Sequence, residues 1–66
     1  MKNTLKIERA IKNITQDELA KIIGVSRQTI NAMEACKYVP STVLALKIAK
    51  YFGKHVEDIF TLDAED

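Results

Sequence analysis

Apolar residues recur at helical spacing along most of this 66-residue chain, and polar residues, glycine and proline divide the pattern into short segments. Asn13, Gly24 and Gly53 stand where apolar segments end, and Pro40 stops a helix from running through. Hydroxyl residues that can cap a helix stand before three segments: Thr15, Ser26 and Ser41. The pattern predicts an all-α fold of five helices, at about 3–12, 16–23, 27–35, 42–52 and 56–60.

The segment 42–52 is apolar around most of its circumference, with Lys47 and Lys50 as its only clearly polar positions beyond the first residue. A helix of this kind needs cover on more than one side. Two interpretations stay open. The helix is either central and buried within one subunit, or it contributes to contacts between two subunits.

A second apolar stripe, Ile7 and Ile11, lies at i, i+4 on the first predicted helix. We expect the segment 60–62 to cover this stripe. The same segment is expected to pair as a short strand with residues 2–5.

The chain is short enough to lie near the lower limit of what one hydrophobic core can stabilise. Cys36 and His55 are the only cysteine and histidine, so neither a disulfide nor a metal site is expected, and no cofactor. Cys36 without a resolving partner is interpreted as tolerated rather than as a redox switch. Oligomerisation is the usual remaining source of stability, which favours a homodimer of a single domain over residues 1–66.

The net charge is +1, but it is unevenly distributed. Residues 1–54 carry ten Lys and Arg against four acidic residues, whereas residues 55–66 carry five acidic residues and no Lys or Arg. This suits a protein with one polyanion-facing side, although a solvated surface with a charged end explains it equally well. With no signal-peptide pattern and no segment long enough to span a bilayer, we expect a cytoplasmic protein without membrane contact.

Residues 15–34 have the layout of a helix-turn-helix, in which two helices of about eight residues meet at a tight turn. Small Ala20 lets the helices approach, Gly24 permits the turn, and Ile30 and Met33 anchor the second helix. The motif opens with a capping box, Thr15-Gln16-Asp17-Glu18.

The outer face of the second motif helix is polar at its N-terminal end, with Arg27, Gln28 and Asn31 beside Ser26 and Thr29. Arginine can donate two hydrogen bonds to guanine, and glutamine can both donate to and accept from adenine, in the major groove. A helix N-terminus also favours nearby phosphate. The segment 27–35 is therefore predicted to be a recognition helix for double-stranded DNA.

The sequence resembles the phage-repressor-like (Cro/repressor, xenobiotic-response-element type) helix-turn-helix family, and within it the compact stand-alone regulators. The residues that carry the resemblance are "ITQDELAKIIGVSRQTINAMEACKYVPS", "LALKIAKYFG" and "VEDIF". The resemblance implies a compact five-helix bundle of the lambda-repressor-like type.

The resemblance also implies roles for individual residues. Gln16 clamps a backbone phosphate, and base edges are read by Arg27 and Gln28, with Asn31 one turn on. Further phosphate contacts cluster at Ser26, Thr29, Lys37 and Tyr38. A structural ion pair joins Arg9 to Glu34. Two alternatives stay open, because Arg27 can contact phosphate instead of a base and Tyr38 can pack over its loop.

The chain departs from the family pattern after the recognition helix. Cys36 replaces the usual glycine, so that either a non-glycine residue is held in a left-handed conformation, at a cost of roughly 1 kcal/mol, or the loop has another shape. Ala35 replaces a polar neighbour and removes one expected loop contact to DNA. His55 stands where the last helix usually has a polar cap, and we expect it to be a weaker cap rather than a pH sensor.

We therefore expect a transcriptional repressor that binds an inverted-repeat operator as a homodimer. The alternative is an antitoxin-like protein-interaction module with autoregulatory DNA binding, although only about six residues follow Phe60 to wrap a partner. No nucleophile–base pair or phosphate loop is present, so neither an enzyme nor a small-molecule effector site is expected.

Overall fold

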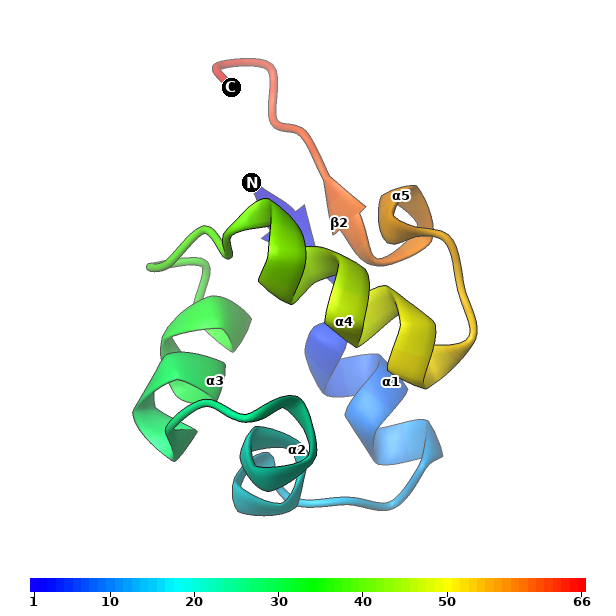
Figure 1. Cartoon of the computed structure of the whole chain (residues 1–66). Coiled ribbons are helices and arrows are strands. Elements are labelled where there is room, and N and C mark those ends of the chain that lie inside the picture. Colours follow the sequence, from blue (N-terminus) through cyan, green and yellow to red (C-terminus); the bar gives the residue numbers. More distant parts are fainter.

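The computed structural model describes residues 1–66 as five helices and a two-stranded antiparallel sheet (Figure 1). The helices are α1 (Leu5–Ile11), α2 (Gln16–Ile23), α3 (Arg27–Glu34), α4 (Thr42–Phe52) and α5 (Val56–Ile59). The strands are β1 (Lys2–Asn3) and β2 (Phe60–Thr61), with Lys2 opposite Thr61 and Asn3 opposite Phe60. The predicted all-α fold with a short pairing of the two chain ends is confirmed.

Side-chain caps begin three of the helices as the sequence predicts. The Thr15 hydroxyl accepts from the Glu18 N–H (3.0 Å) while the Glu18 carboxylate accepts from the Thr15 N–H (2.9 Å), which completes the capping box. The hydroxyls of Ser26 and Ser41 each accept from the N–H three residues on, both at 3.2 Å. At α5 the His55 side chain makes no cap hydrogen bond, and the Asp58 carboxylate accepts from the His55 N–H instead.

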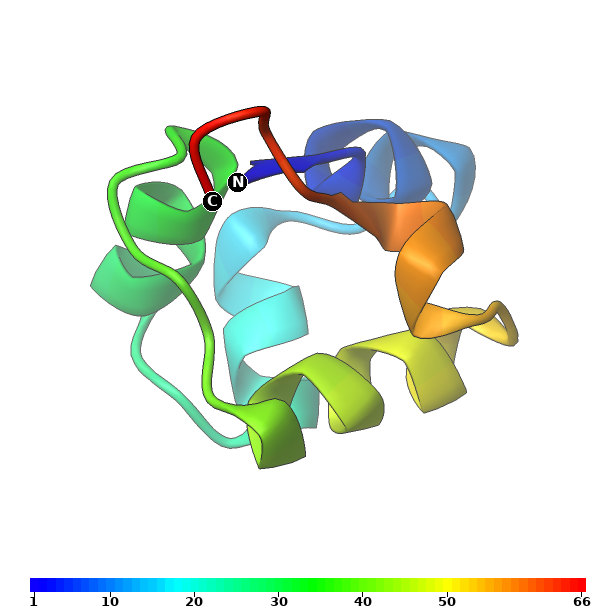
Figure 2. The same cartoon turned by 90° about the horizontal axis from the view of Figure 1, so that it is seen from above.

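The core lies between the helices, with α1 and α4 on opposite sides of it and α2 and α3 packed closely together (Figure 2). Each helix and the second strand contribute apolar side chains to one cluster. Its fully buried members are Leu5, Leu19, Ile30, Met33, Ile48 and Ile59. One core therefore fixes how α3 is presented to solvent.

A partly buried ion pair also joins distant parts of the chain. Glu8 on α1 is only 7% exposed, and its carboxylate lies 2.7 Å from the Lys54 ammonium in the loop before α5. Nearby, the Thr4 N–H donates to the Ile59 carbonyl (2.9 Å). These contacts, together with the β pairing, hold α5 against the start of α1.

The predicted cover over Ile7 and Ile11 is wrong, because these side chains are 60% and 71% exposed. Helix α1 turns Leu5 and Glu8 inward instead, and pairing of β2 with β1 directs Phe60 into the core. The expected first helix is also shorter than predicted, since residues 2–3 form β1.

Helix α4 is buried on one side only. Leu44, Ile48 and Phe52 lie in the core, whereas Val43 and Leu46 are 64% and 55% exposed. The interpretation of this segment as a central helix buried within one subunit is therefore wrong, and its outer apolar side is left without cover.

Cys36 adopts the left-handed conformation that the family pattern reserves for glycine, with φ at +60°. Its N–H donates to the Met33 carbonyl (3.0 Å), and the next N–H, of Lys37, donates to the Ala32 carbonyl (2.8 Å). The loop thus keeps the shape of a left-handed helix stop, and the strain falls on Cys36. Asn13 is also left-handed, at +55°, as expected for an asparagine that ends a helix.

We predict that Cys36→Gly raises the free energy of unfolding by about 0.5–1 kcal/mol, because relief of the left-handed strain exceeds the extra chain entropy of glycine. Urea denaturation measures the change. Cys36→Ala keeps a Cβ and serves as the control, with no gain expected. An equal gain for both variants would mean that the thiol, not the backbone, is unfavourable.

Candidate nucleic-acid interface

The core orients α3 so that its polar side faces outward. Ile30 and Met33 are fully buried, whereas Arg27, Gln28 and Asn31 on the other side are exposed. A helix with buried residues at these positions leaves a continuous outer stripe. The candidate base-reading side chains therefore lie together on one solvent-facing surface.

Gln16, at the start of α2, is hydrogen-bonded to α3 from both ends of its amide. Its Nε2 donates to Glu34 Oε1 (3.1 Å), and its Oε1 accepts from Asn31 Nδ2 (3.4 Å). One hydrogen-bond network thus holds Gln16, the candidate phosphate contact, and Asn31, a candidate base-reading residue, before DNA binds. The sequence placed Gln16 at the interface but did not indicate this contact with Glu34.

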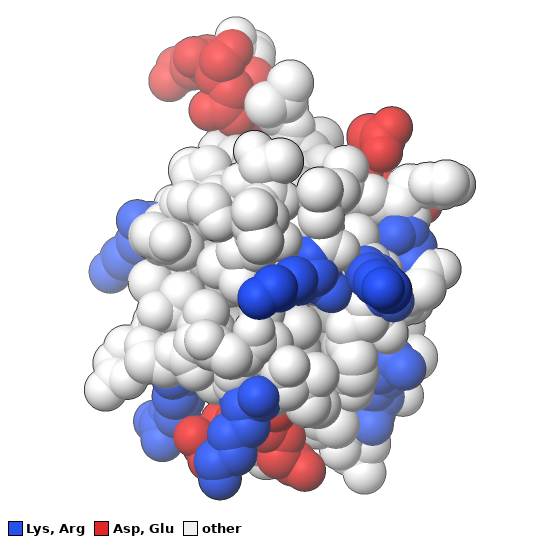
Figure 3. Space-filling model, in the orientation of Figure 1, with Lys and Arg blue, Asp and Glu red and all other residues white.

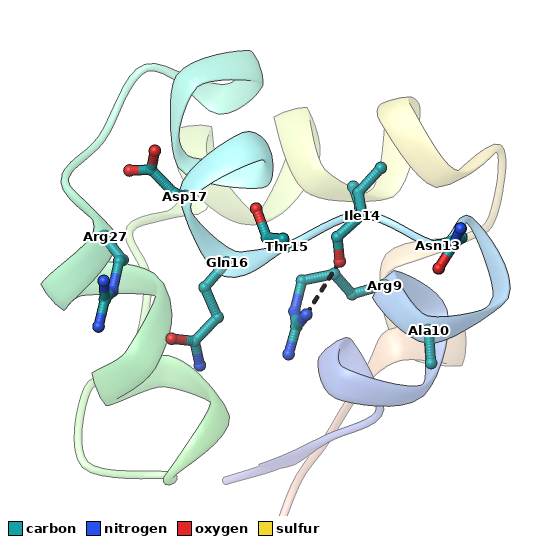
Figure 4. A pocket seen from close by; sticks show the side chains of 8 residues that line it. All are labelled: Arg9, Ala10, Asn13, Ile14, Thr15, Gln16, Asp17 and Arg27. Atoms are coloured by element: carbon teal, nitrogen blue, oxygen red, sulfur yellow. Dashed lines mark hydrogen bonds between the residues drawn. The ribbon is translucent and has the colours of Figure 1, made fainter.

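The same network ends in an ion pair between Arg9 on α1 and Glu34 on α3. Arg9 Nε donates to Glu34 Oε2 (2.7 Å) and Arg9 Nη2 donates to Glu34 Oε1 (3.1 Å). The third guanidinium nitrogen donates to the Ile14 carbonyl (2.9 Å), a bond drawn in Figure 4. The side chains of Arg9 and Glu34 are only 17% and 6% exposed. This guanidinium fixes α1, the loop before α2 and α3 relative to one another.

The charge of Glu34 is stabilised by these partners. Burial alone would raise the pKa of its carboxyl, but hydrogen bonds from Arg9 and Gln16 outweigh burial and hold the pKa below the ordinary value of 4.5. The same pairing raises the pKa of Arg9. Glu34 is therefore ionised near neutral pH and accepts from both neighbours.

The other residues predicted to contact DNA lie either at the N-terminal cap of α3 or in the exposed loop after it. Ser26 Oγ is occupied as the cap of α3, and it lies 3.0 Å from the hydroxyl of Thr29. Lys37 and Tyr38 are exposed in the loop after α3, where Tyr38 retains 43% of its surface. Figure 4 shows a hollow that lies between the end of α1, the loop before α2, the start of α2 and the start of α3, where Gln16, Asp17 and Arg27 form part of its lining.

A second hollow, of about 400 Å³, lies along the outer side of α3. It is lined by Arg27, Gln28, Asn31, Ala32 and Lys37. Four of these five residues were predicted to meet DNA, and Ala32 was not. A small apolar residue gives no sequence signal of its own, so only the structure brings it into this surface.

Figure 3 shows acidic side chains over α2, whose first turn carries Asp17 and Glu18, and further acidic side chains at the opposite end of the molecule, where the chain ends lie. There the carboxylates of Asp63 and Asp66 lie 3.0 and 3.2 Å from the Met1 amino group. The acidic residues of the tail thus lie at the end of the molecule opposite α2. No cluster of three or more metal-ligating side chains is present, and no helix is long and apolar enough to cross a membrane.

Comparison with known proteins agrees with this arrangement. A helix-turn-helix family model matches residues 5–59, which span α1 to α5. The chain belongs to this helix-turn-helix family. It is 58% identical to an uncharacterized HTH-type transcriptional regulator of Methanocaldococcus jannaschii, with all of both chains covered. It is 50% identical to one of Archaeoglobus fulgidus, covering 93% of that relative, and 47% identical to YgzD of Bacillus subtilis over the whole of both chains.

We predict that Glu34→Gln lowers the free energy of unfolding at pH 7 by about 2 kcal/mol, because Arg9 then lacks a charged acceptor in a largely buried site. The folded-state pKa of Glu34 is lowered, so its contribution is present above pH 4.5 and is lost as the pH falls below that value. The difference in the free energy of unfolding between the wild type and Glu34→Gln should therefore become smaller in acid. Urea denaturation at a series of pH values measures it.

Asp17→Asn is the matched control, because Asp17 pairs with Lys21 at 3.4 Å on the exposed side of α2. An exposed pair of this kind contributes at most about 0.5 kcal/mol. Equal losses for Glu34→Gln and Asp17→Asn would show that the buried network contributes no more than a surface pair.

Proposed function

We propose that residues 1–66 act as a sequence-specific DNA-binding domain of a cytoplasmic transcriptional repressor, which binds an inverted-repeat operator as a homodimer. The observation that carries the proposal is the outer surface of α3, where Arg27, Gln28 and Asn31 lie together beside Gln16. The relatives are HTH-type transcriptional regulators by name, which supports the regulatory role.

In the proposed complex, α3 lies in the major groove and its exposed side chains face base edges. Arg27 offers two donors suited to guanine, and Gln28 offers a donor and an acceptor suited to adenine. Gln16 and Lys37, on either side of α3 in sequence, contact the phosphates that flank the groove. Since Gln16 is already hydrogen-bonded to Glu34, little side-chain freedom is lost when it binds.

The proposed dimer surface is the uncovered side of α4 with the loop before it. Val39, Val43 and Leu46 are 63%, 64% and 55% exposed. Beside them is a hollow of about 240 Å³ whose lining contains no charged side chain: Met1, Val39, Pro40, Thr42, Ala45, Leu46, Val56 and Phe60. In Figure 3 the area over the first turns of α4 is free of Lys, Arg, Asp and Glu.

A second copy of this chain is the proposed occupant of that surface. An uncharged apolar patch is self-complementary, which a two-fold symmetric interface requires. Two copies joined there would present two α3 helices to successive major grooves, about 34 Å apart on one face of the duplex. Binding across a promoter would then lower transcription by occluding it.

We predict that Gln28→Ala weakens binding to the operator by 1–3 kcal/mol and mostly spares binding to random DNA, because the lost contact is to a base. Lys37→Ala should weaken binding to both DNAs. It should also reduce the slope of log affinity against log salt concentration by about one, the value for one phosphate contact. Fluorescence anisotropy at several salt concentrations separates the two. Equal losses on operator and random DNA for Gln28→Ala would contradict base readout.

We predict that Leu46→Glu makes the protein monomeric, because two carboxylates would be buried against an apolar surface. Operator affinity should then fall at least tenfold, since each copy binds one half-site alone. Sedimentation equilibrium gives the mass in solution. Ile11→Glu is the matched control, because Ile11 is equally apolar and 71% exposed but lies on α1. A Leu46→Glu protein that remains dimeric would refute this surface.

A further inference from the structure

A hollow of about 300 Å³ lies between the end of α2 and the second half of α4. Its lining residues are Ile22, Ile23, Lys47, Lys50 and Tyr51. None of them belongs to the candidate DNA surface or to the proposed dimer surface. A ligand bound in this hollow would therefore compete with neither.

The floor of the hollow is apolar and its shape is fixed. Ile23 belongs to the core cluster, whereas Ile22 beside it is 50% exposed. The Tyr51 ring packs edge-on against Phe52, with 5.0 Å between the ring centroids, and the Lys12 ammonium lies 5.0 Å from the Tyr51 centroid. Because these contacts hold the ring, an apolar side chain that enters the hollow has little of the protein to order.

The rim of the hollow is basic. Lys47 and Lys50 are exposed, and neither forms an ion pair with a carboxylate of the chain. By contrast, Lys54 in the next loop is paired with Glu8 at 2.7 Å. Figure 3 shows basic side chains and no acidic ones over the middle of α4. Unpaired positive charge beside an apolar floor favours a ligand that combines negative charge with an apolar group.

The apolar floor distinguishes between two classes of negatively charged ligand. A nucleic-acid backbone would meet the ammonium groups but would leave Ile22 and Tyr51 without an apolar partner. A peptide satisfies both parts of the hollow, because one short segment can carry an apolar side chain between carboxylates. We propose that the hollow binds an acidic segment of a partner protein, which inserts one large apolar side chain over Ile22 and Tyr51. The carboxylates on either side of it pair with Lys47 and Lys50.

This inference goes beyond the proposed function and does not depend on it. The hollow and the outer side of α3 share no residue, so one molecule can hold the acidic segment and DNA together. The partner would then be brought to the DNA to which this chain is bound.

Selection from a displayed library of short random peptides by the wild-type protein tests the inference. We expect enrichment of one large apolar residue flanked by Asp and Glu. The same selection with the double variant Lys47→Glu/Lys50→Glu should enrich Lys and Arg around the apolar residue instead, because the charge of the rim is reversed and the floor is kept.

Fluorescence anisotropy with the best selected peptide separates the two parts of the site. Ile22→Ser should weaken binding about tenfold, the value for covering about half of a large apolar side chain. Ile7→Ser on α1, where Ile7 is 60% exposed, is the matched control and should leave binding unchanged. Lys50→Glu should weaken binding about fivefold, the upper value for an exposed ion pair. Lys2→Glu changes the net charge equally at a side chain that is 78% exposed on β1, and it should have no effect.

The inference is overturned if no peptide is enriched, if the enriched peptides lack acidic residues, or if the double variant selects the same peptides as the wild type. Two further outcomes would assign the hollow to another ligand and also overturn it. A peptide of this chain's residues 60–66 that binds as tightly as the selected one would make a second copy the occupant. A Lys50→Glu protein that keeps the peptide but loses random DNA would make Lys50 a phosphate contact.

Discussion

The ion pair between Arg9 and Glu34 is the interaction on which the interface depends. It joins two helices whose residues are 25 positions apart, with nitrogen–oxygen distances of 2.7 and 3.1 Å, and Glu34 is nearly inaccessible to solvent. Removing one partner of such a pair leaves the other charge uncompensated in a largely buried site. Glu34 Oε1 also accepts from Gln16, so one carboxylate serves both the packing of α1 against α3 and the placement of a candidate DNA-contacting side chain.

The structure separates the residues that build this surface from those that are free to bind. Buried Ile30 and Met33 set the rotation of α3, and Ser26 is engaged as its cap. Arg27 and Gln28 neither pack in the core nor cap the helix, and both are exposed. A rigid scaffold with a few free polar side chains reduces the entropy lost on binding. The strained Cys36 loop continues this scaffold to Lys37.

The local features could be predicted from sequence, and so could the pairing of the chain ends and, by resemblance, the ion pair of Arg9 with Glu34. The other long-range contacts could not. Caps, turns and the helix-turn-helix follow from residues within a few positions of one another, such as Thr15 with Glu18. The pair of Glu8 with Lys54, 46 positions apart, has no sequence pattern. Periodicity assigned Ile7 and Ile11 to one face but did not show that this face stays exposed, because the cover of a helix face depends on how distant elements pack. The sequence did not indicate that Ala32 lines the hollow along α3, because a small apolar residue carries no signal without its spatial neighbours.

We propose that this chain reads DNA sequence through paired α3 helices. Selection of bound sequences from a random pool of duplex DNA by the wild-type protein is the decisive measurement. We expect enrichment of an inverted repeat whose half-sites are centred one helical turn apart. Enrichment of a single unpaired site would contradict the dimer, and a pool that shows no enriched sequence would contradict sequence recognition itself.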